Sequence, residues 1–159
     1  MILGASAEAL HAIEVAHRRG YNVLALDGSP SAPGLAAADE SAVVDIIDPS
    51  AVLTLLGSRR PDVILPVPVG RALVSTGEMN DILGLPGVSR ATADYCTDKY
   101  AFAKGLSEKG LRDVRCLLAS EVQDDPSLLD ALRFPVIVKP RFGSGSRGVV
   151  LAEDRTMVM

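Results

Sequence analysis

FPVIVKPRFGSGSRGVVL, residues 134–151, is the most informative stretch of this sequence. It begins with Phe134 to Val138, a short run of apolar and mostly β-branched residues that is typical of a buried strand. Val149 to Leu151 has a similar composition, and we expect it to be the returning strand. The residues between the two runs are therefore predicted to form a loop that joins neighbouring strands.

This loop combines small residues with positive charge. Its small residues are Gly143, Ser144, Gly145, Ser146 and Gly148. Glycine lets the backbone adopt positive φ and approach a ligand closely, which leaves N–H groups free to point at an anion. Lys139, Arg141 and Arg147 add cationic side chains, and Pro140 favours an extended conformation at Lys139. The order of strand, cation, small-residue loop and strand predicts a clamp for polyphosphate.

The loop composition also fits a simpler interpretation, a flexible hairpin with solvated arginines, because glycine-rich loops are common. A P-loop is excluded, since no Gly-Lys-Ser/Thr ends the loop and no helix follows at once. The order of the pieces favours phosphate binding over the simpler interpretation.

The stretch resembles the phosphate-gripping hairpin of the ATP-grasp superfamily, in its carbamoyl-phosphate-synthase-like and biotin-carboxylase-like branch. The resemblance implies that Lys139 contacts the nucleotide and that residues Gly143 to Gly148 fold over its phosphates. It also matches Asp98-Lys99 to the family's Asp-Lys pair, which implies that Lys99 reaches the ATP phosphates. Arg147 is the candidate catalytic residue, expected to hold the transferring group.

The first 90 residues repeat strand and helix with short joins. Strands are expected at 2–3, 21–27, 41–44 and 62–67, and helices after Ser6, Asp48 and Gly70, with a loop at 28–38. Alternation of this kind predicts an α/β class with a Rossmann-like, doubly wound parallel sheet over 1–90. The patterns GAS, DGSPSAPGLAAADE and LGLPGVS also resemble landmarks of the domain that precedes the ATP-grasp fold in this family.

A dinucleotide-binding Rossmann domain begins in a similar way, with an acidic residue such as Asp27 ending its second strand. Its G-x-G-x-x-G fingerprint falls here on Gly4, Ser6 and Ala9, so only the first glycine is present. We therefore expect a Rossmann-like fold that holds no dinucleotide. Ligands of such sheets bind at the carboxyl ends of the strands, where Arg71 either faces an anionic substrate or is an ordinary surface arginine.

Residues 91–159 are expected to form a partial α+β ATP-grasp lobe. Two helices are predicted within 89–110, the first capped by Ser89 and the second by Thr97 or Asp98. A strand is predicted over 114–118, and Asp125-Pro126 begins a short helix before the hairpin.

Composition excludes several classes of function. A net charge of −4 argues against sequence-independent nucleic-acid binding, and no run of 18 apolar residues exists to span a membrane. Cys96 and Cys116 are too few for a disulfide framework or a zinc site, which favours a cytoplasmic protein with reduced thiols. His11 and His17 lie six apart on the first helix and do not share a face, so no metal site is predicted there.

The resemblance implies an ATP-dependent ligase that uses Mg²⁺, activates a small-molecule carboxylate as an acyl phosphate, and lets an amine displace the phosphate. Because that family places its magnesium ligands on a second lobe, we expect them beyond residue 159. This chain would then be an inactive N-terminal part whose uncovered apolar side favours self-association into homo-oligomers. The alternative is a non-catalytic Rossmann-like module that binds a nucleotide or small anion.

Overall fold

The computed structural model describes residues 1–67, 70, 72–113, 115–143 and 145–158. It divides into two compact units, Met1–Asp94 and Tyr95–Met159, and the division falls within helix α5 (Arg90–Thr97). The predicted domain boundary at residue 90 stays a prediction.

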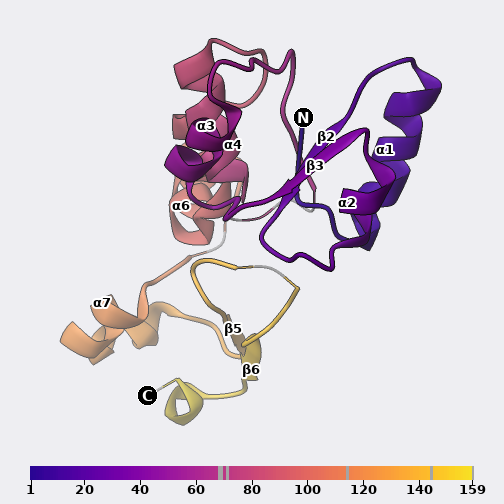
Figure 1. The fold of residues 1–159 in the computed structure, drawn as a ribbon. Helices are drawn as coiled ribbons and strands as arrows, with labels where there is room; N and C mark the ends of the chain where they lie inside the picture. Colours follow the sequence, from indigo (N-terminus) through magenta and orange to yellow (C-terminus); the bar gives the residue numbers. More distant parts are fainter. Residues whose placement is uncertain (68–69, 71, 114, 144, 159) are drawn as a thin grey trace. The chain divides into compact units, whose positions relative to one another are not determined.

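A parallel sheet forms the centre of the first unit (Figure 1). Its strands are β1 (Ile2–Leu3), β2 (Leu24–Asp27), β3 (Glu40–Val43) and β4 (Leu65–Pro66). They lie in the order β3-β2-β1-β4, so β1 has a neighbour on each side. Ile2 is in register with Ala25 of β2 and with Leu65 of β4. The predicted α/β class and parallel sheet are confirmed, although the second and fourth strands are shorter than expected.

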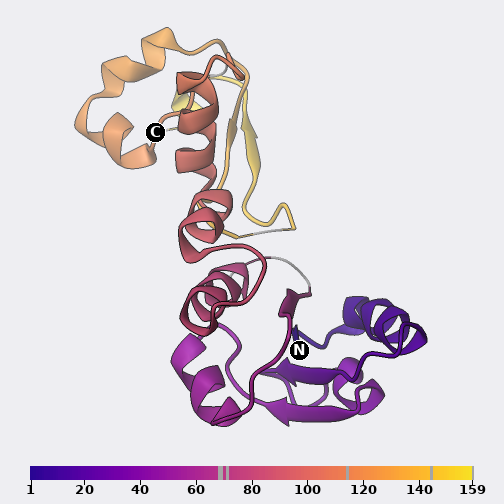
Figure 2. The same cartoon turned by 90° about the horizontal axis from the view of Figure 1, so that it is seen from above.

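Helices cover both faces of this sheet (Figures 1 and 2). They are α1 (Ala7–Arg18), α2 (Pro33–Ala37), α3 (Pro49–Leu56) and α4 (Ala72–Leu83). Helices α1 and α2 lie together on one face, and α3 and α4 lie together on the other. The sheet is therefore doubly wound, as the alternation of strand and helix predicts.

The alternating directions of side chains along β1 divide the core between the two faces. Leu3 belongs to a cluster that includes Val52 of α3 and Met79 of α4. Ile2, the preceding residue, packs in a second cluster with Ile13 of α1. Because neighbouring residues of one strand enter different clusters, both faces of β1 are buried, and the strand reads as a short, wholly apolar run.

The predicted loop at 28–38 contains a helix, α2, which the sequence interpretation did not anticipate. Pro33 at the first turn supplies the helical φ, and the small residues after it cost little side-chain entropy. The N–H of Gly34 donates to the carbonyl of Ala5 at 2.7 Å. A Cβ on Gly34 would lie 2.9 Å from that carbonyl oxygen, so only glycine allows this helix to approach the first strand–helix turn.

Asp48 confirms its predicted role as a helix cap, since its carboxylate accepts from the N–H groups of Ser50 and Ala51. Ser6 is also in the capping position, but its hydroxyl donates to Glu8 at 2.5 Å and accepts no backbone N–H. The helix start there is correct, and the hydrogen bond that was expected to hold it is absent.

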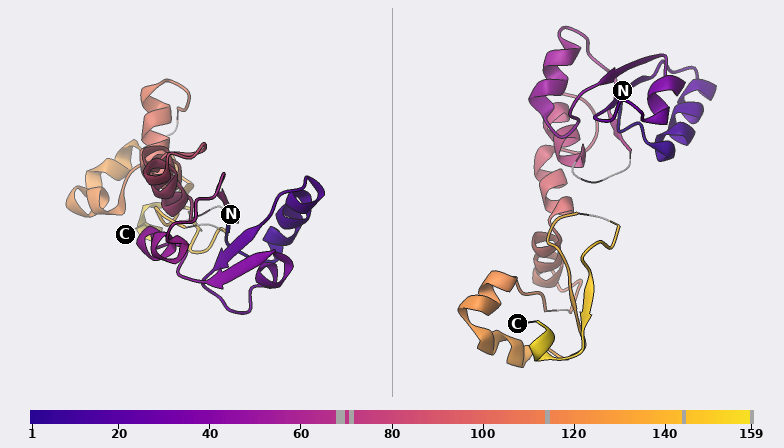
Figure 3. Two further views of the ribbon diagram at one scale, coloured as in Figure 1. Left: turned by 45° about the horizontal axis from the view of Figure 1, so that its top comes forward. Right: turned by 60° about the horizontal axis from the view of Figure 1, so that its bottom comes forward.

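The second unit pairs helices with a two-stranded ribbon. Its helices are α6 (Lys99–Glu108), α7 (Ala119–Asp124) and the 3₁₀ turns η1 (Pro126–Ala131) and η2 (Arg155–Met157). Strands β5 (Val136–Val138) and β6 (Val150–Ala152) are antiparallel, with Ile137 opposite Leu151. The ribbon runs beside α6, as the right-hand view of Figure 3 shows.

The strand predicted over 114–118 is wrong for its described part. Residue 114 lies outside the described residues, and 115–118 form no strand. The N–H of Leu118 donates instead to the Glu121 carboxylate at 2.7 Å, at the start of α7. A side chain of the next turn thus satisfies the donor that a neighbouring strand would have used. Within the described part of the chain, no helix is long and apolar enough to cross a membrane.

Candidate functional site

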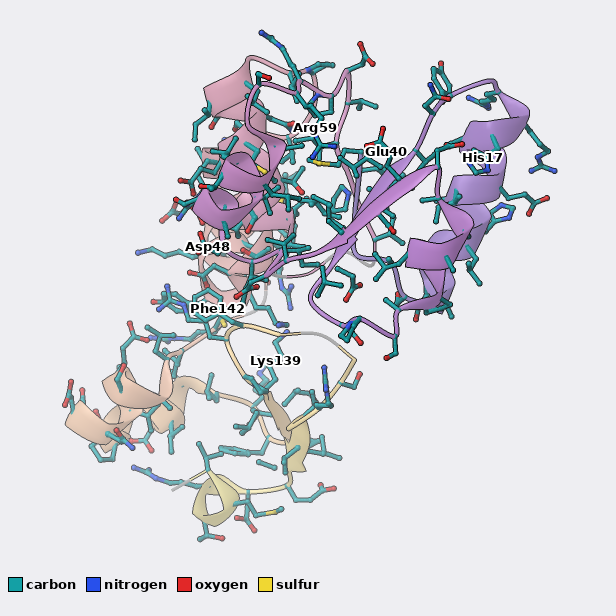
Figure 4. The ribbon with its side chains drawn as sticks, viewed as in Figure 1. His17, Glu40, Asp48, Arg59, Lys139 and Phe142 are labelled. Atoms are coloured by element: carbon teal, nitrogen blue, oxygen red, sulfur yellow. The ribbon has the colours of Figure 1, made fainter. Side chains whose placement is uncertain are left out.

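The loop between β5 and β6 leaves the ribbon at Lys139, which Figure 4 labels where the strand ends. Its backbone has positive φ at Gly143 (106°), Gly145 (71°) and Gly148 (70°). Ser146 also has positive φ (55°) and is the only non-glycine residue described with such a conformation. This run of left-handed residues bends the chain back toward β6, and it explains why the loop is built from glycine and serine.

The loop presents backbone donors to solvent. All its described residues are exposed, and no acceptor among the described residues bonds the N–H groups of Gly145, Ser146 or Arg147. Exposed N–H groups in a bent, left-handed backbone form a concavity that suits an anion. At its far end the loop is packed more closely, because a Cβ on Gly148 would lie 3.1 Å from the Pro140 ring.

Lys99 meets the start of the loop. It is the first residue of α6, and its ammonium donates to the carbonyl oxygen of Gly143 at 2.6 Å. Its backbone N–H donates to the carbonyl of Arg141 at 3.2 Å. A cation at a helix N-terminus is opposed by the helix dipole, and neutral carbonyls do not cancel its charge. The ammonium is therefore an uncompensated charge, held at the edge of the exposed loop.

Asp98 and Arg141 form an ion pair next to this contact. Arg141 donates from Nε to Asp98 Oδ1 (2.8 Å) and from Nη2 to Oδ2 (2.5 Å), a two-point contact between residues 43 apart in sequence. Asp98 is buried and also caps α6, accepting from the N–H groups of Tyr100 and Ala101. The Arg141 guanidinium lowers the pKa of Asp98 the most, and the two backbone donors lower it further. Burial acts in the opposite direction, and the pKa falls to about 2.

Aromatic side chains complete the surroundings of Arg141. Its guanidinium carbon lies 5.6 Å from the centre of the Tyr100 ring and 5.3 Å from that of Phe142, within cation–π range. The Tyr100 hydroxyl donates to Glu121 at 2.9 Å, and this bond raises the tyrosine pKa. The guanidinium is therefore paired with a carboxylate and flanked by two rings, so its own charge is already satisfied.

The structure brings some predicted site residues together and leaves others apart. Lys99 touches the loop at Gly143, whereas the Lys139 and Arg147 side chains have no hydrogen-bond or ionic partner among the described residues. Gly145, Ser146 and Gly148 lie on the exposed loop, and Ser144 lies outside the described residues. Three cations without a carboxylate partner among the described residues thus occur on or beside one stretch of exposed backbone donors.

The sequence interpretation named Asp98 as a cap and Arg141 as a loop cation, but it did not predict that they pair. A separation of 43 residues leaves no periodic signal for such a contact. The available signal was weaker. Asp98 lies next to Lys99 and Arg141 lies near Lys139, and both lysines were assigned to one anion site.

In the first unit, Asp27 at the carboxyl end of β2 is occupied by internal contacts. The Asp27 carboxylate accepts from the N–H groups of Ala5 (2.6 Å) and Ser29 (2.8 Å). It therefore stabilises the first strand–helix turn, which argues against a role in holding a ribose. Arg71, the candidate for an anionic substrate, lies outside the described residues.

Metal-binding side chains are not clustered in the described part of the chain: no three His, Cys, Asp or Glu residues there could hold an ion together. His17 instead contacts Asp39 at 2.9 Å, and Asp39 accepts from the N–H of Val23. Cys96 and Cys116 are free and exposed.

Solved structures with similar folds are enzymes that bind nucleotides or join small molecules. N5-carboxyaminoimidazole synthetase from Staphylococcus aureus, solved as a complex with ADP, matches 98% of this chain and 41% of its own, with a TM-score of 0.79 at 22% identity. L-amino acid ligase from Bacillus licheniformis matches 99% of this chain and 39% of its own, with a TM-score of 0.76 at 23% identity. At these identities the likeness establishes the fold alone.

Sequence comparison agrees with the fold. The homologues of this chain are ATP-grasp enzymes, and the chain is similar to about two fifths of their length. It is 32% identical to the formate-dependent phosphoribosylglycinamide formyltransferase of Synechococcus sp. (strain CC9311) over 154 residues, which cover 93% of this chain and 38% of that protein. The enzyme of the same name from Parasynechococcus marenigrum (strain WH8102) is 29% identical. No protein-family model matches the chain.

Proposed function

We propose that this chain binds the phosphates of ATP within an ATP-grasp ligase, which activates a carboxylate as an acyl phosphate for attack by an amine. The chain spans about 38% of the length of its curated relatives, so the proposed reaction concerns a longer protein. One observation carries the proposal: the Lys99 ammonium lies at the start of an exposed, left-handed loop whose N–H groups are unpaired among the described residues.

The proposed roles follow from charge and position. Lys99 and Lys139 would neutralise phosphate oxygens from the two sides of the loop entrance, while Gly143, Gly145, Ser146 and Gly148, with Ser144, would supply backbone donors. Arg147 would hold the transferring phosphoryl group. Phosphoryl transfer depends mainly on positioning and on stabilising negative charge, and fixed cations with backbone donors serve both needs.

Mg²⁺ is expected for this chemistry, since a divalent ion bridges the phosphates of the nucleotide. The described residues include no group of His, Cys, Asp or Glu suited to hold it. Mg²⁺ would therefore enter with the nucleotide.

The acceptor is proposed only as a class. Relatives named as formate-dependent formyltransferases and a structural neighbour named as an amino acid ligase favour small carboxylates and amines. A cytoplasmic location remains an expectation from the two thiols. A non-catalytic nucleotide-binding module is the alternative, and acceptor-dependent release of ADP by the longer protein separates the two.

The decisive variant is Lys139→Ala in the longer protein. We expect turnover to be abolished with the fold intact, because Lys139 stands at the strand end beneath the loop. Lys109→Ala, a change of the same chemistry at the end of α6, is the matched control and should retain activity. Unchanged ATP hydrolysis by folded Lys139→Ala would contradict the assignment.

The 159-residue chain alone should bind MgATP with a Kd of roughly 1 mM, about −4 kcal/mol. Ordering a free loop costs about 1–2 kcal/mol of backbone entropy per residue, and this chain alone offers few contacts to offset it. Calorimetry with MgATP, run beside an ADP-release assay with candidate carboxylates, measures both properties. Micromolar binding or acceptor-dependent ADP release by this chain would overturn the expectation.

A further inference from the structure

Asp98 performs two separate tasks with one carboxylate. Oδ1 accepts from the N–H groups of Tyr100 and Ala101 and thereby caps α6, and both oxygens accept from Arg141. The side chain of Asp98 is 12% exposed, whereas that of Arg141 is 43% exposed. The carboxylate is thus fixed within the second unit, and the arginine is attached to it from the loop side.

Residues 98–100 and 141–143 are joined at several points. Besides the ion pair, Lys99 donates its backbone N–H to the carbonyl of Arg141 and its ammonium to the carbonyl of Gly143. Tyr100 and Phe142, one from each segment, flank the guanidinium. These contacts all fall on the first part of the loop, before the left-handed turn at Gly145 and Ser146.

We propose that Asp98 and Arg141 are positioning residues, which hold the start of the glycine-rich loop against the N-terminus of α6 so that Lys99 and the loop N–H groups face the same phosphate. This inference rests on the proposed function. Arg141 does not itself bind the phosphate in this proposal, because Asp98 already neutralises its charge in a two-point contact.

The physical reason lies in the geometry that phosphate binding requires. A loop free at both ends would lose more backbone entropy on binding than a loop fixed at one end. A displacement of the donors by about 1 Å can cost a hundredfold in the function of a site. Anchoring Arg141 therefore lowers the ordering cost and sets where Gly143 stands relative to the Lys99 ammonium.

The two tasks of Asp98 can be separated by substitution. Asp98→Asn keeps a good helix cap, because asparagine caps as well as aspartate, but it loses the charge that holds Arg141. Arg141→Gln removes the other partner, and the double variant completes a thermodynamic cycle. Asp130→Asn is the matched control, since it makes the same change in the ion pair between Asp130 and Arg155, away from the loop.

The measurement is an NMR titration of the ¹⁵N-labelled 159-residue chain with MgATP, which resolves millimolar affinities. We expect Asp98→Asn and Arg141→Gln each to weaken binding about tenfold, and the double variant to be no weaker than either single one. The heteronuclear NOE at Phe142 and Gly143 should fall in both single variants without ligand. Asp130→Asn should leave affinity and NOE unchanged.

The outcomes separate this inference from the proposed function. If the unsubstituted chain shows no MgATP binding, the proposed function fails, and the NOE at Gly143 still tests the anchor. If the pair merely stabilises the fold, its removal will lower the unfolding midpoint and leave the affinity and the NOE of the folded chain unchanged. That result would overturn the proposal. Should Asp98→Asn fail to fold, the half-exposed Arg141 provides the same test through Arg141→Gln and Arg141→Lys.

Discussion

The two units of this chain bury their apolar residues to very different extents. In the first unit, Leu3 and Leu26 of the central strands are wholly buried, with helices on both faces of the sheet. In the second, Ile137 and Leu151 face each other across the ribbon and remain 56% and 47% exposed. A doubly wound sheet covers itself, whereas two strands alone leave both of their faces largely open.

The second unit combines a smaller set of buried apolar residues with polar contacts that fix its loop. Asp98, Arg141 and Lys99 fix the start of its loop, and Arg155 reaches back to Asp130 and to the carbonyl of Pro126. Polar contacts hold a segment at defined points and leave the segment between them free. The comparison thus associates the packed unit with stability and the polar contacts of the second unit with the proposed phosphate site.

The largest expected effect separates the two units by a core substitution in each. Leu26→Ala should lower the free energy of unfolding by about 3 kcal/mol, because it leaves a cavity between the sheet and its helices. Ile137→Ala should change it by no more than about 0.5 kcal/mol, since that side chain is mostly exposed already. Urea unfolding of the 159-residue chain measures both, and equal losses would break the comparison.

A second test concerns close packing around α2. Gly34→Ala should destabilise the first unit by about 2 kcal/mol, since the new Cβ would lie 2.9 Å from the backbone oxygen of Ala5. Gly28→Ala is the control, because a Cβ there meets only Val44 O at 3.8 Å. Thermal unfolding followed by circular dichroism compares them. Similar melting temperatures for the two variants would show that α2 can move away without cost.

The pH dependence of the second unit gives a smaller effect. The pKa of Asp98 is depressed to about 2, so its stabilising contribution is present above the unfolded pKa and is lost as pH falls through about 2. We expect about 1 kcal/mol after allowing for the solvent exposure of Arg141. Urea unfolding of the chain and of Asp98→Asn between pH 6 and pH 2 measures it. The variant should lack this part of the pH dependence, and parallel curves would contradict the prediction.

Self-association tests the exposed ribbon most directly, and it is expected to have the smallest effect on stability. Apolar surface at Ile137, Val150 and Leu151 should drive weak association at micromolar concentrations. Ile137→Lys should reduce it without unfolding the chain, while Tyr21→Lys, a substitution of an exposed residue of the first unit, should not. Sedimentation velocity compares the association of the two variants with that of the unsubstituted chain. A strictly monomeric unsubstituted chain would contradict the prediction.

The sequence predicted those parts of the fold that local chemistry controls. Alternating apolar strands and helices gave the class, and Asp48 followed by Pro49 located a helix start to the residue. Helix α2 was missed because a stretch with two prolines and two glycines reads as a loop until a partner for Gly34 is known. The strand predicted over 114–118 failed in its described part, 115–118, because a strand needs a neighbour and no local pattern shows that one is missing.

The same limit applies to the candidate site. Glycine content predicted the left-handed loop, and Lys99 was assigned to it by resemblance and now lies against it. The pairing of Asp98 with Arg141 depends on the path of the chain between them, which sequence spacing does not encode. Local conformation was therefore predictable from residue type, and long-range polar partners were not.

The place of β1 in the sheet affects how this chain folds as it is synthesised. Ile2 leaves the ribosome before any of its partners, yet it needs Ala25 on one side and Leu65 on the other. Until residue 65 emerges, one edge of an apolar strand has no neighbour, and such edges pair readily with the wrong chain. The interval between the release of β2 and that of β4 is thus the period in which this edge of β1 is open to wrong pairing.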